Sequence, residues 1–94
     1  MDHRPSEELL ESTHGFPGVY RFKAIGRSEA DFQTRVLDAV VGEVVSASEI
    51  DYSVRETPGG RHVAVTLDVT VQTAEQVRSI YARIRELDGL LLLL

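Results

Sequence analysis

The chain has 94 residues, 43% of them hydrophobic, which is enough for one small domain with a modest core. Fifteen acidic residues against ten basic ones give a formal net charge of −5, which disfavours binding to the phosphate backbone of a nucleic acid. Cysteine is absent, so disulfides, thiol catalysis and thiolate metal sites are excluded.

The N-terminal residues 1–15 are polar and acidic, and we expect them to form a flexible leader ahead of one domain over residues 16–94. They contain no basic segment followed by an apolar one, so they do not resemble a secretory signal. The apolar run at residues 90–94 is far shorter than the roughly 20 residues that a membrane-spanning helix needs. We therefore expect a cytoplasmic protein with no membrane partner.

A strand and a helix are the first elements predicted after the leader. Residues 19–25 alternate in polarity, which directs Tyr20 and Phe22 inward because the residues between and after them are basic and costly to bury. A helix is expected over residues 29–45, where apolar residues recur at the helical period. Ser28 is predicted to cap this helix by accepting a hydrogen bond from a backbone N–H of its first turn.

Two further strands are predicted to form a hairpin over residues 50–56 and 61–72. The turn between them contains Pro58, Gly59 and Gly60, and the glycines supply the positive φ that a tight turn requires. The alternation directs one set of side chains of each strand inward: Ile50, Tyr52 and Val54, and then Val63, Val65, Leu67, Val69 and Val71.

A second helix is expected over residues 74–88, followed by a last strand over residues 90–94. Thr73 and Gln76 have the spacing of a capping box, and Gly89 is predicted to end the helix. The order strand, helix, strand, strand, helix, strand predicts an α+β fold, a ferredoxin-like βαββαβ sandwich. In that fold the antiparallel sheet has the strand order 4-1-3-2, both helices cover one face, and the other face is open.

Several segments resemble one family of small bacterial proteins. They are residues 16–26 (FPGVYRFKAIG), the proline-glycine hairpin after Ser53, the tyrosine of the second helix and the terminal Leu-Asp-Gly-Leu. Over about residues 16–94 the chain resembles the YbeD-like family. The resemblance implies a fold like that of ACT regulatory domains. It also implies a link to lipoate metabolism, because genes of some members lie beside genes of lipoate attachment. No catalytic residues are established for the family, so none can be assigned here by resemblance.

The residues themselves indicate no catalytic or metal site. His3, His14 and His62 lack the short spacing of zinc ligands, and no nucleophile with a matching base accompanies them. We therefore predict a non-enzymatic protein without a metal or other cofactor.

One candidate ligand site lies at the turn formed by Gly26, Arg27 and Ser28. The free N–H groups at the start of the following helix, together with the charge of Arg27, could hold a small carboxylate or phosphate. The alternative interpretation is a plain strand-to-helix turn with a cap.

The open face of the sheet carries four basic or titratable residues, Arg21, Lys23, Arg55 and His62. RNA-recognition modules use the same face, but they stack bases on aromatic side chains displayed from it. The aromatic residues of the first strand are predicted to point the other way, so nucleic acid is an unfavoured partner and RNA binding remains the alternative function.

The terminal leucines predict an apolar edge strand, and alternation turns some of them away from the helices. This supports two interpretations. In the first, they form an interface for a homodimer. In the second, the leader covers them through Leu9, Leu10 and Phe16. The predicted interface residues are Val19, Ile25, Leu90, Leu92 and Leu94.

The function that fits these observations is that of a small regulatory or adaptor domain. It would act by binding a protein or a small anionic ligand rather than by catalysis.

Overall fold

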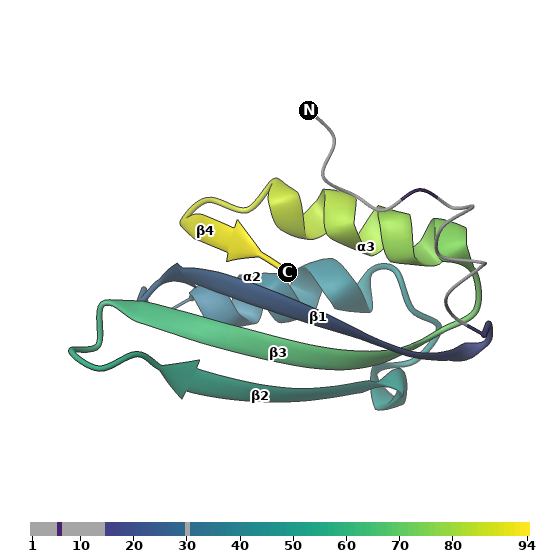
Figure 1. The fold of residues 1–94 in the computed structure, drawn as a ribbon, viewed down its shortest axis with the longest axis horizontal. Helices are drawn as coiled ribbons and strands as arrows, with labels where there is room; N and C mark the ends of the chain where they lie inside the picture. Colours follow the sequence, from purple (N-terminus) through teal and green to yellow (C-terminus); the bar gives the residue numbers. More distant parts are fainter. Residues whose placement is uncertain (1–5, 7–14, 30) are drawn as a thin grey trace.

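The computed structural model describes residues 6, 15–29 and 31–94, which form an α+β arrangement around one sheet (Figure 1). Most of the predicted leader lies outside the described residues. The sheet is antiparallel with the strand order β2-β3-β1-β4, as predicted, and both α-helices lie on one of its faces (Figure 1). The elements in chain order are β1 (Gly18–Arg27), α2 (Phe32–Val41), a short 3-10 helix (Ala47–Glu49), β2 (Ile50–Glu56), β3 (His62–Val71), α3 (Ala74–Arg85) and β4 (Leu90–Leu93).

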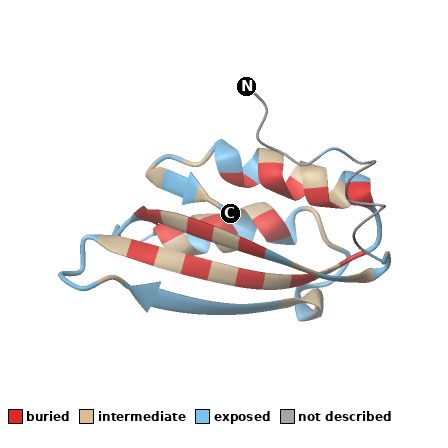
Figure 2. Ribbon diagram, viewed as in Figure 1, coloured by how far each residue is buried: buried red, intermediate tan, exposed pale blue. Residues whose placement is uncertain are grey.

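The two central strands, β1 and β3, supply the sheet side of the core. They pair over ten residues, from Gly18 opposite Val71 to Arg27 opposite His62. Every second residue of β3 is buried beneath the helices, which gives the strand its alternating pattern in Figure 2. The predicted inward face of this strand is therefore confirmed.

An aromatic cluster joins β1 to α3 and confirms that Tyr20 and Phe22 face the helices. The Phe22 ring lies 4.9 Å from the Tyr81 ring and 5.0 Å from the Tyr20 ring, centroid to centroid. The hydroxyl groups of Tyr20 and Tyr81 share a hydrogen bond of 3.2 Å. Burial, and then the bond to Tyr20, raises the pKa of Tyr81 well above its ordinary value.

The start of α3 confirms the predicted cap. Thr73 Oγ1 accepts a hydrogen bond from the backbone N–H of Gln76 (3.1 Å), and Gln76 Oε1 accepts one from the backbone N–H of Gln72 (2.7 Å). The helix ends at Arg85, three residues earlier than predicted, and Gly89, with φ of 86°, turns the chain into β4.

The prediction for the first helix was wrong at both ends. The helix spans Phe32–Val41 rather than residues 29–45, and its N-cap is Asp31, which makes no side-chain capping bond. Ser28 does not cap it. Its backbone N–H instead donates to the carbonyl oxygen of Arg61 (3.0 Å), so this residue extends the strand pairing of β1 toward the hairpin.

The prediction that β2 is buried on one side was also wrong. Tyr52 lies opposite Leu67 and Val54 opposite Val65, so both point to the helix side of the sheet, as expected. Tyr52 is nevertheless 52% exposed and Val54 37% exposed, because neither α2 nor α3 extends over this edge strand. Strand β2 has water on both faces along most of its length (Figure 2).

Candidate functional site

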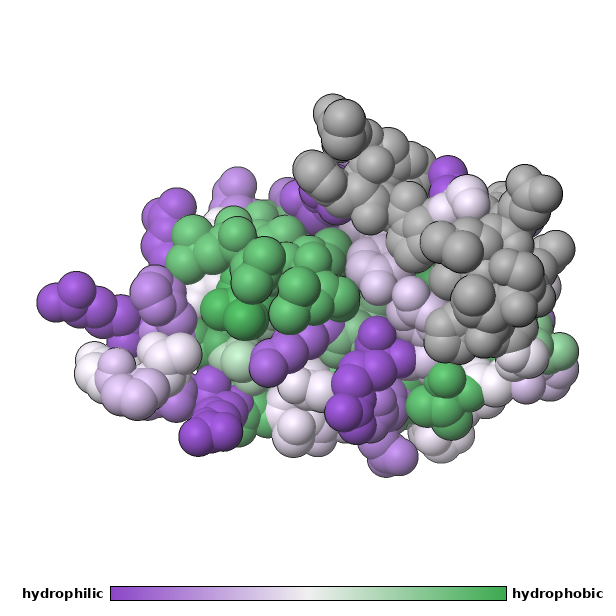
Figure 3. All heavy atoms as spheres, viewed as in Figure 1, coloured by the Kyte–Doolittle hydropathy of each residue, from purple (hydrophilic) through white to green (hydrophobic). Residues whose placement is uncertain are grey.

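An apolar patch lies on the open face of the sheet at the β4 edge. We define the leucine patch as Ile25, Leu91, Leu92 and Leu94. The three leucines are 51%, 48% and 57% exposed, and Ile25 lies beside them on β1, directly opposite Leu92. Figure 3 shows apolar side chains gathered over this edge. Large exposed apolar patches on proteins often mark interaction sites.

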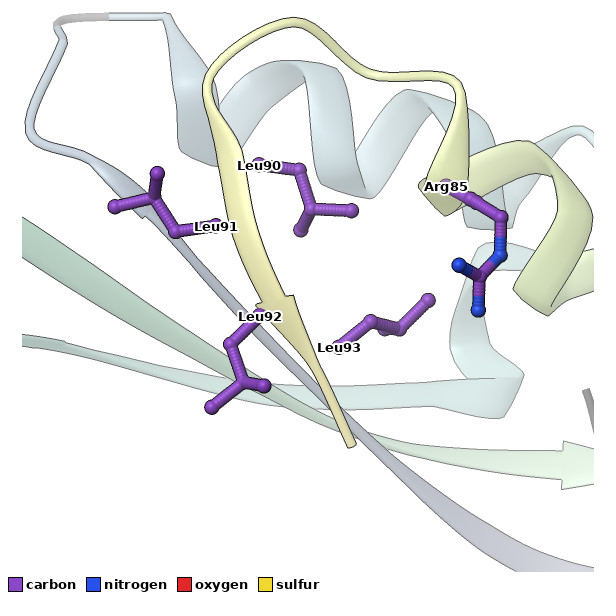
Figure 4. A pocket seen from close by; sticks show the side chains of 5 residues that line it. All are labelled: Arg85, Leu90, Leu91, Leu92 and Leu93. Atoms are coloured by element: carbon purple, nitrogen blue, oxygen red, sulfur yellow. The ribbon is translucent and has the colours of Figure 1, made fainter. Parts of the chain in front are cut away.

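A β-bulge decides which leucines are exposed. Leu92 lies opposite Ile25 but Leu90 lies opposite the next residue, Gly26, so Leu91 is an extra residue in β4. Leu91 and Leu92 consequently point to the same side, while Leu90 and Leu93 point to the other, toward the helix layer (Figure 4).

The alternation predicted Leu90 as an exposed interface residue, and this is corrected. Leu90 is half-buried and packs against the core, and Leu91 takes the exposed place. No signal in a run of five identical side chains could have shown the bulge.

A hollow of about 440 Å³ lies along β4. It is lined by Arg85, from the last turn of α3, and by Leu90, Leu91, Leu92 and Leu93 (Figure 4). Leu91 and Leu92 belong both to the leucine patch and to the lining of this hollow, so the two adjoin at the β4 edge.

Val19 does not join the leucine patch, although the sequence placed it in the same interface. It is 65% exposed on the open face, but it lies opposite Thr70 at the far end of β1. Arg21 and Lys23 lie between it and Ile25 on this face. The predicted interface therefore separates into a leucine patch at one end and an isolated valine at the other.

The middle of the open face is charged. The guanidinium group of Arg21 donates two hydrogen bonds to the carboxylate of Asp68, through Nε (2.8 Å) and one terminal nitrogen (3.0 Å). This bonding holds the pKa of Asp68 below its ordinary value. A hollow of about 350 Å³ beside the pair is lined by Arg21, Asp51, Tyr52, Ser53, Thr66 and Asp68. One of the basic groups proposed for an RNA platform is thus paired with a carboxylate, and the strand aromatics Tyr20 and Phe22 point to the core.

The predicted anion site at Gly26, Arg27 and Ser28 is not at a helix start. Gly26 and Arg27 belong to β1, and α2 begins at Phe32. The Arg27 N–H donates to the Gly89 carbonyl oxygen (2.9 Å), and the N–H of Ser28 is bonded within the hairpin end as described above. Anion binding at this turn stays a prediction that depends on the Arg27 side chain alone.

A close contact with the Phe32 ring explains why position 26 is a glycine. A Cβ atom placed on Gly26 would lie 2.4 to 2.7 Å from three atoms of the Phe32 ring. Phe32 is fully buried, and the guanidinium carbon of Arg35 lies 5.7 Å from the centroid of its ring. Gly26 therefore makes room for the first buried residue of α2.

Among residues 6, 15–29 and 31–94, no three histidine, cysteine, aspartate or glutamate side chains gather as a metal site would require. His3 and His14 lie outside these residues, and His62 begins β3, where its backbone N–H donates to Thr57 Oγ1 (3.2 Å). In the same part of the chain, no helix has the length and apolar character to cross a membrane.

Comparison with known proteins gives a consistent family. A family model described as "Protein of unknown function (DUF493)" matches residues 11–94. A UPF0250 protein of Shewanella piezotolerans is 31% identical over 83 residues, covering 88% of each chain. A UPF0250 protein of Chromobacterium violaceum is 33% identical over 75 residues, covering 80% of each, and one of Pasteurella multocida is 30% identical over the whole of both chains. The chain therefore belongs to the DUF493 family of bacterial UPF0250 proteins, which is the YbeD-like family.

Proposed function

We propose that this protein is a non-enzymatic regulatory or adaptor domain that acts by binding a protein through the leucine patch. The observation that carries the proposal is the exposure of Leu91, Leu92 and Leu94 together at an uncovered sheet edge. Leaving three half-exposed leucines in water sacrifices the free energy that their burial would release, at about 25 cal/mol for each Å². A surface that binds a partner recovers this free energy in the complex.

The chemistry around the patch supports binding rather than catalysis. The hollow beside it is lined by leucines and one arginine, a set that offers neither a nucleophile nor a general base. The turn at Gly26, Arg27 and Ser28 is a weaker candidate for a small-ligand site, because the N–H groups of Arg27 and Ser28 are already bonded to carbonyl oxygens.

The strand order and the placement of both helices on one face support classification as a ferredoxin-like, ACT-like domain. A regulatory role is proposed by analogy with ACT domains, since a fold by itself does not determine function. The resemblance to the YbeD-like family makes an enzyme of lipoate attachment the first partner to test.

The test is an affinity capture from bacterial lysate with mass spectrometry, run in parallel on the wild type and two variants. Leu92→Lys introduces a charge into the leucine patch, whereas Val19→Lys introduces the same charge on the same face outside it. We expect a discrete metabolic enzyme to be retained by the wild type and by Val19→Lys and lost with Leu92→Lys. Capture of ribosomal or transcript-bound material that is insensitive to Leu92→Lys would contradict the proposal and favour RNA binding.

A further inference from the structure

The backbone of β4 offers unpaired hydrogen-bonding groups along its outer edge. Leu94 exchanges two hydrogen bonds with Lys23 of β1: its N–H donates to the Lys23 oxygen (2.8 Å), and its oxygen accepts from the Lys23 N–H (3.0 Å). Alternate residues of an antiparallel strand direct their peptide groups to opposite sides. The N–H and C=O groups of Leu93 therefore point away from β1, and in the described part of the sheet β4 has no strand on that side.

This edge is short and carries a bulge, but it lacks the charged side chains and proline that also prevent edges from pairing. Sheet edges are commonly protected by charged side chains or proline, and the other edge strand, β2, follows that rule with Asp51, Arg55 and Glu56. Strand β4 consists of leucine alone. Its bulge lies at Leu91, so the segment from Leu92 to Leu94 remains regular and able to pair.

We propose that a second copy of this chain pairs with β4, antiparallel and about a two-fold axis at Leu93. The inference rests on the proposed function of the leucine patch and adds that a second copy extends the patch across the β4 edge. The free N–H and C=O of Leu93 would then bond to those of Leu93 of the partner subunit. In that register Leu92 lies opposite Leu94 of the partner subunit, so that two leucine pairs meet on the open face.

A second copy suits the edge because the pairing is self-complementary. Both strands present the same apolar side chains and the same unpaired groups, so that one two-fold contact satisfies both copies and closes the assembly. The two open faces become one continuous eight-stranded surface. No acidic side chain lies within β4, so none enters the contact itself.

The size of the contact indicates a weak dimer. Three half-exposed leucines supply on the order of 250 Å² of apolar surface, which is less than the roughly 300–600 Å² of the largest patch on a typical monomer. A stable interface buries about 800 Å² on each partner, so the leucines and one short strand edge fall below that size. We therefore expect a dissociation constant in the micromolar range.

Sedimentation of the whole chain over micromolar to near-millimolar concentrations tests the assembly. The wild type and Val19→Lys should both shift from monomer toward dimer, and Leu92→Lys should weaken the dimer by about tenfold because each copy would lose an apolar pair with Leu94 of the partner subunit and gain a charged side chain at the edge. The wild type remaining monomeric throughout, or a dimer that Leu92→Lys leaves unchanged, would overturn the proposal. Circular dichroism of each variant shows whether the fold is kept.

Disulfide trapping tests the register and does not depend on a charged variant. The chain has no cysteine, so a single introduced thiol can cross-link only to its counterpart. Leu93→Cys should cross-link to itself, since directly opposite residues in such a pair lie about 5.5 Å apart, within disulfide range. Leu92→Cys should cross-link faster to Leu94→Cys than to itself. The reverse preference, or equal rates for all combinations, would overturn the register.

These outcomes are distinguishable from failure of the proposed function. If the wild type is monomeric and Leu92→Lys still abolishes capture of a partner enzyme, then the second copy is refuted and the leucine patch remains a binding site. If Leu92→Lys changes neither dimer nor capture, both proposals fail.

Discussion

The contact between Gly26 and Phe32 makes a quantitative prediction about the Gly26→Ala variant. The added methyl group would lie 2.4 to 2.7 Å from three ring atoms of a phenylalanine that is fully buried, so the ring has to move within a filled core. The φ of Gly26 is not positive, so an alanine there is strained by the ring and not by its own backbone.

The expected loss follows from two opposing effects. Overpacking a well-filled core costs about 1–3 kcal/mol. Replacing glycine by alanine at a compatible backbone position gains about 0.4–1 kcal/mol by restricting the unfolded chain. We expect Gly26→Ala to lower the free energy of unfolding by about 1.3 kcal/mol, which is the difference between the midpoints of these two effects.

Equilibrium urea unfolding, followed by circular dichroism, measures this loss. Gly42→Ala is the matched control, because a Cβ there meets nothing closer than 3.7 Å, and it should be neutral or slightly stabilising. In a Phe32→Leu background the obstructing ring atoms are gone, so that adding Gly26→Ala should cost well under about 1 kcal/mol. Equal losses from Gly26→Ala in both backgrounds would refute the steric argument.

Three further predictions concern the core, a cap and an ion pair. Leu67 is fully buried on β3, so Leu67→Ala should lower the free energy of unfolding by about 2–5 kcal/mol in the same assay. Thr66 lies on the open face, so Thr66→Ala should lower it by under about 1 kcal/mol. Equal losses would mean that the strand faces are reversed. Thr73→Ala should lower the free energy of unfolding by about 0.5–2 kcal/mol because it removes the α3 cap, whereas Thr73→Ser keeps a hydroxyl group and should lose much less. Equal melting temperatures for the two variants in thermal unfolding would contradict this role. Arg21→Gln should raise the pKa of Asp68 toward its ordinary value in an NMR titration, and an unchanged pKa would show that the bonded pair does not form in solution. Because folding lowers this pKa, the stabilisation from the pair is present above the ordinary carboxyl pKa and is lost as the pH falls through the folded value.

The sequence predicted the elements whose patterns are both local and unambiguous. Strand β3 alternates without interruption, so its buried face followed directly from the spacing of its valines and Leu67. The start of α3 was equally clear, because Thr73 and Gln76 form their bonds within one turn of chain.

The errors arose where long-range contacts override a local pattern. Ser28 had the right neighbours for a cap, but Arg61 supplies an acceptor from the distant hairpin. Tyr52 and Val54 were assigned to the correct side of the sheet, yet alternation cannot tell whether a helix reaches over an edge strand. In β4 the identical side chains left the register undetermined, and the pairing with β1 introduced the bulge at Leu91.

Strand β2, which is exposed on both faces, pairs with the outer edge of β3 and so keeps that edge from pairing with other chains. It buries little apolar surface of its own, so little apolar burial opposes its detachment. Once it has left, β3 becomes a ten-residue edge with five buried apolar side chains on one face, which is a template for pairing with other chains. The vulnerability of this fold to aggregation therefore depends on how firmly β2 is held. Charged side chains such as Asp51 and Arg55 keep the outermost strand itself from recruiting neighbours.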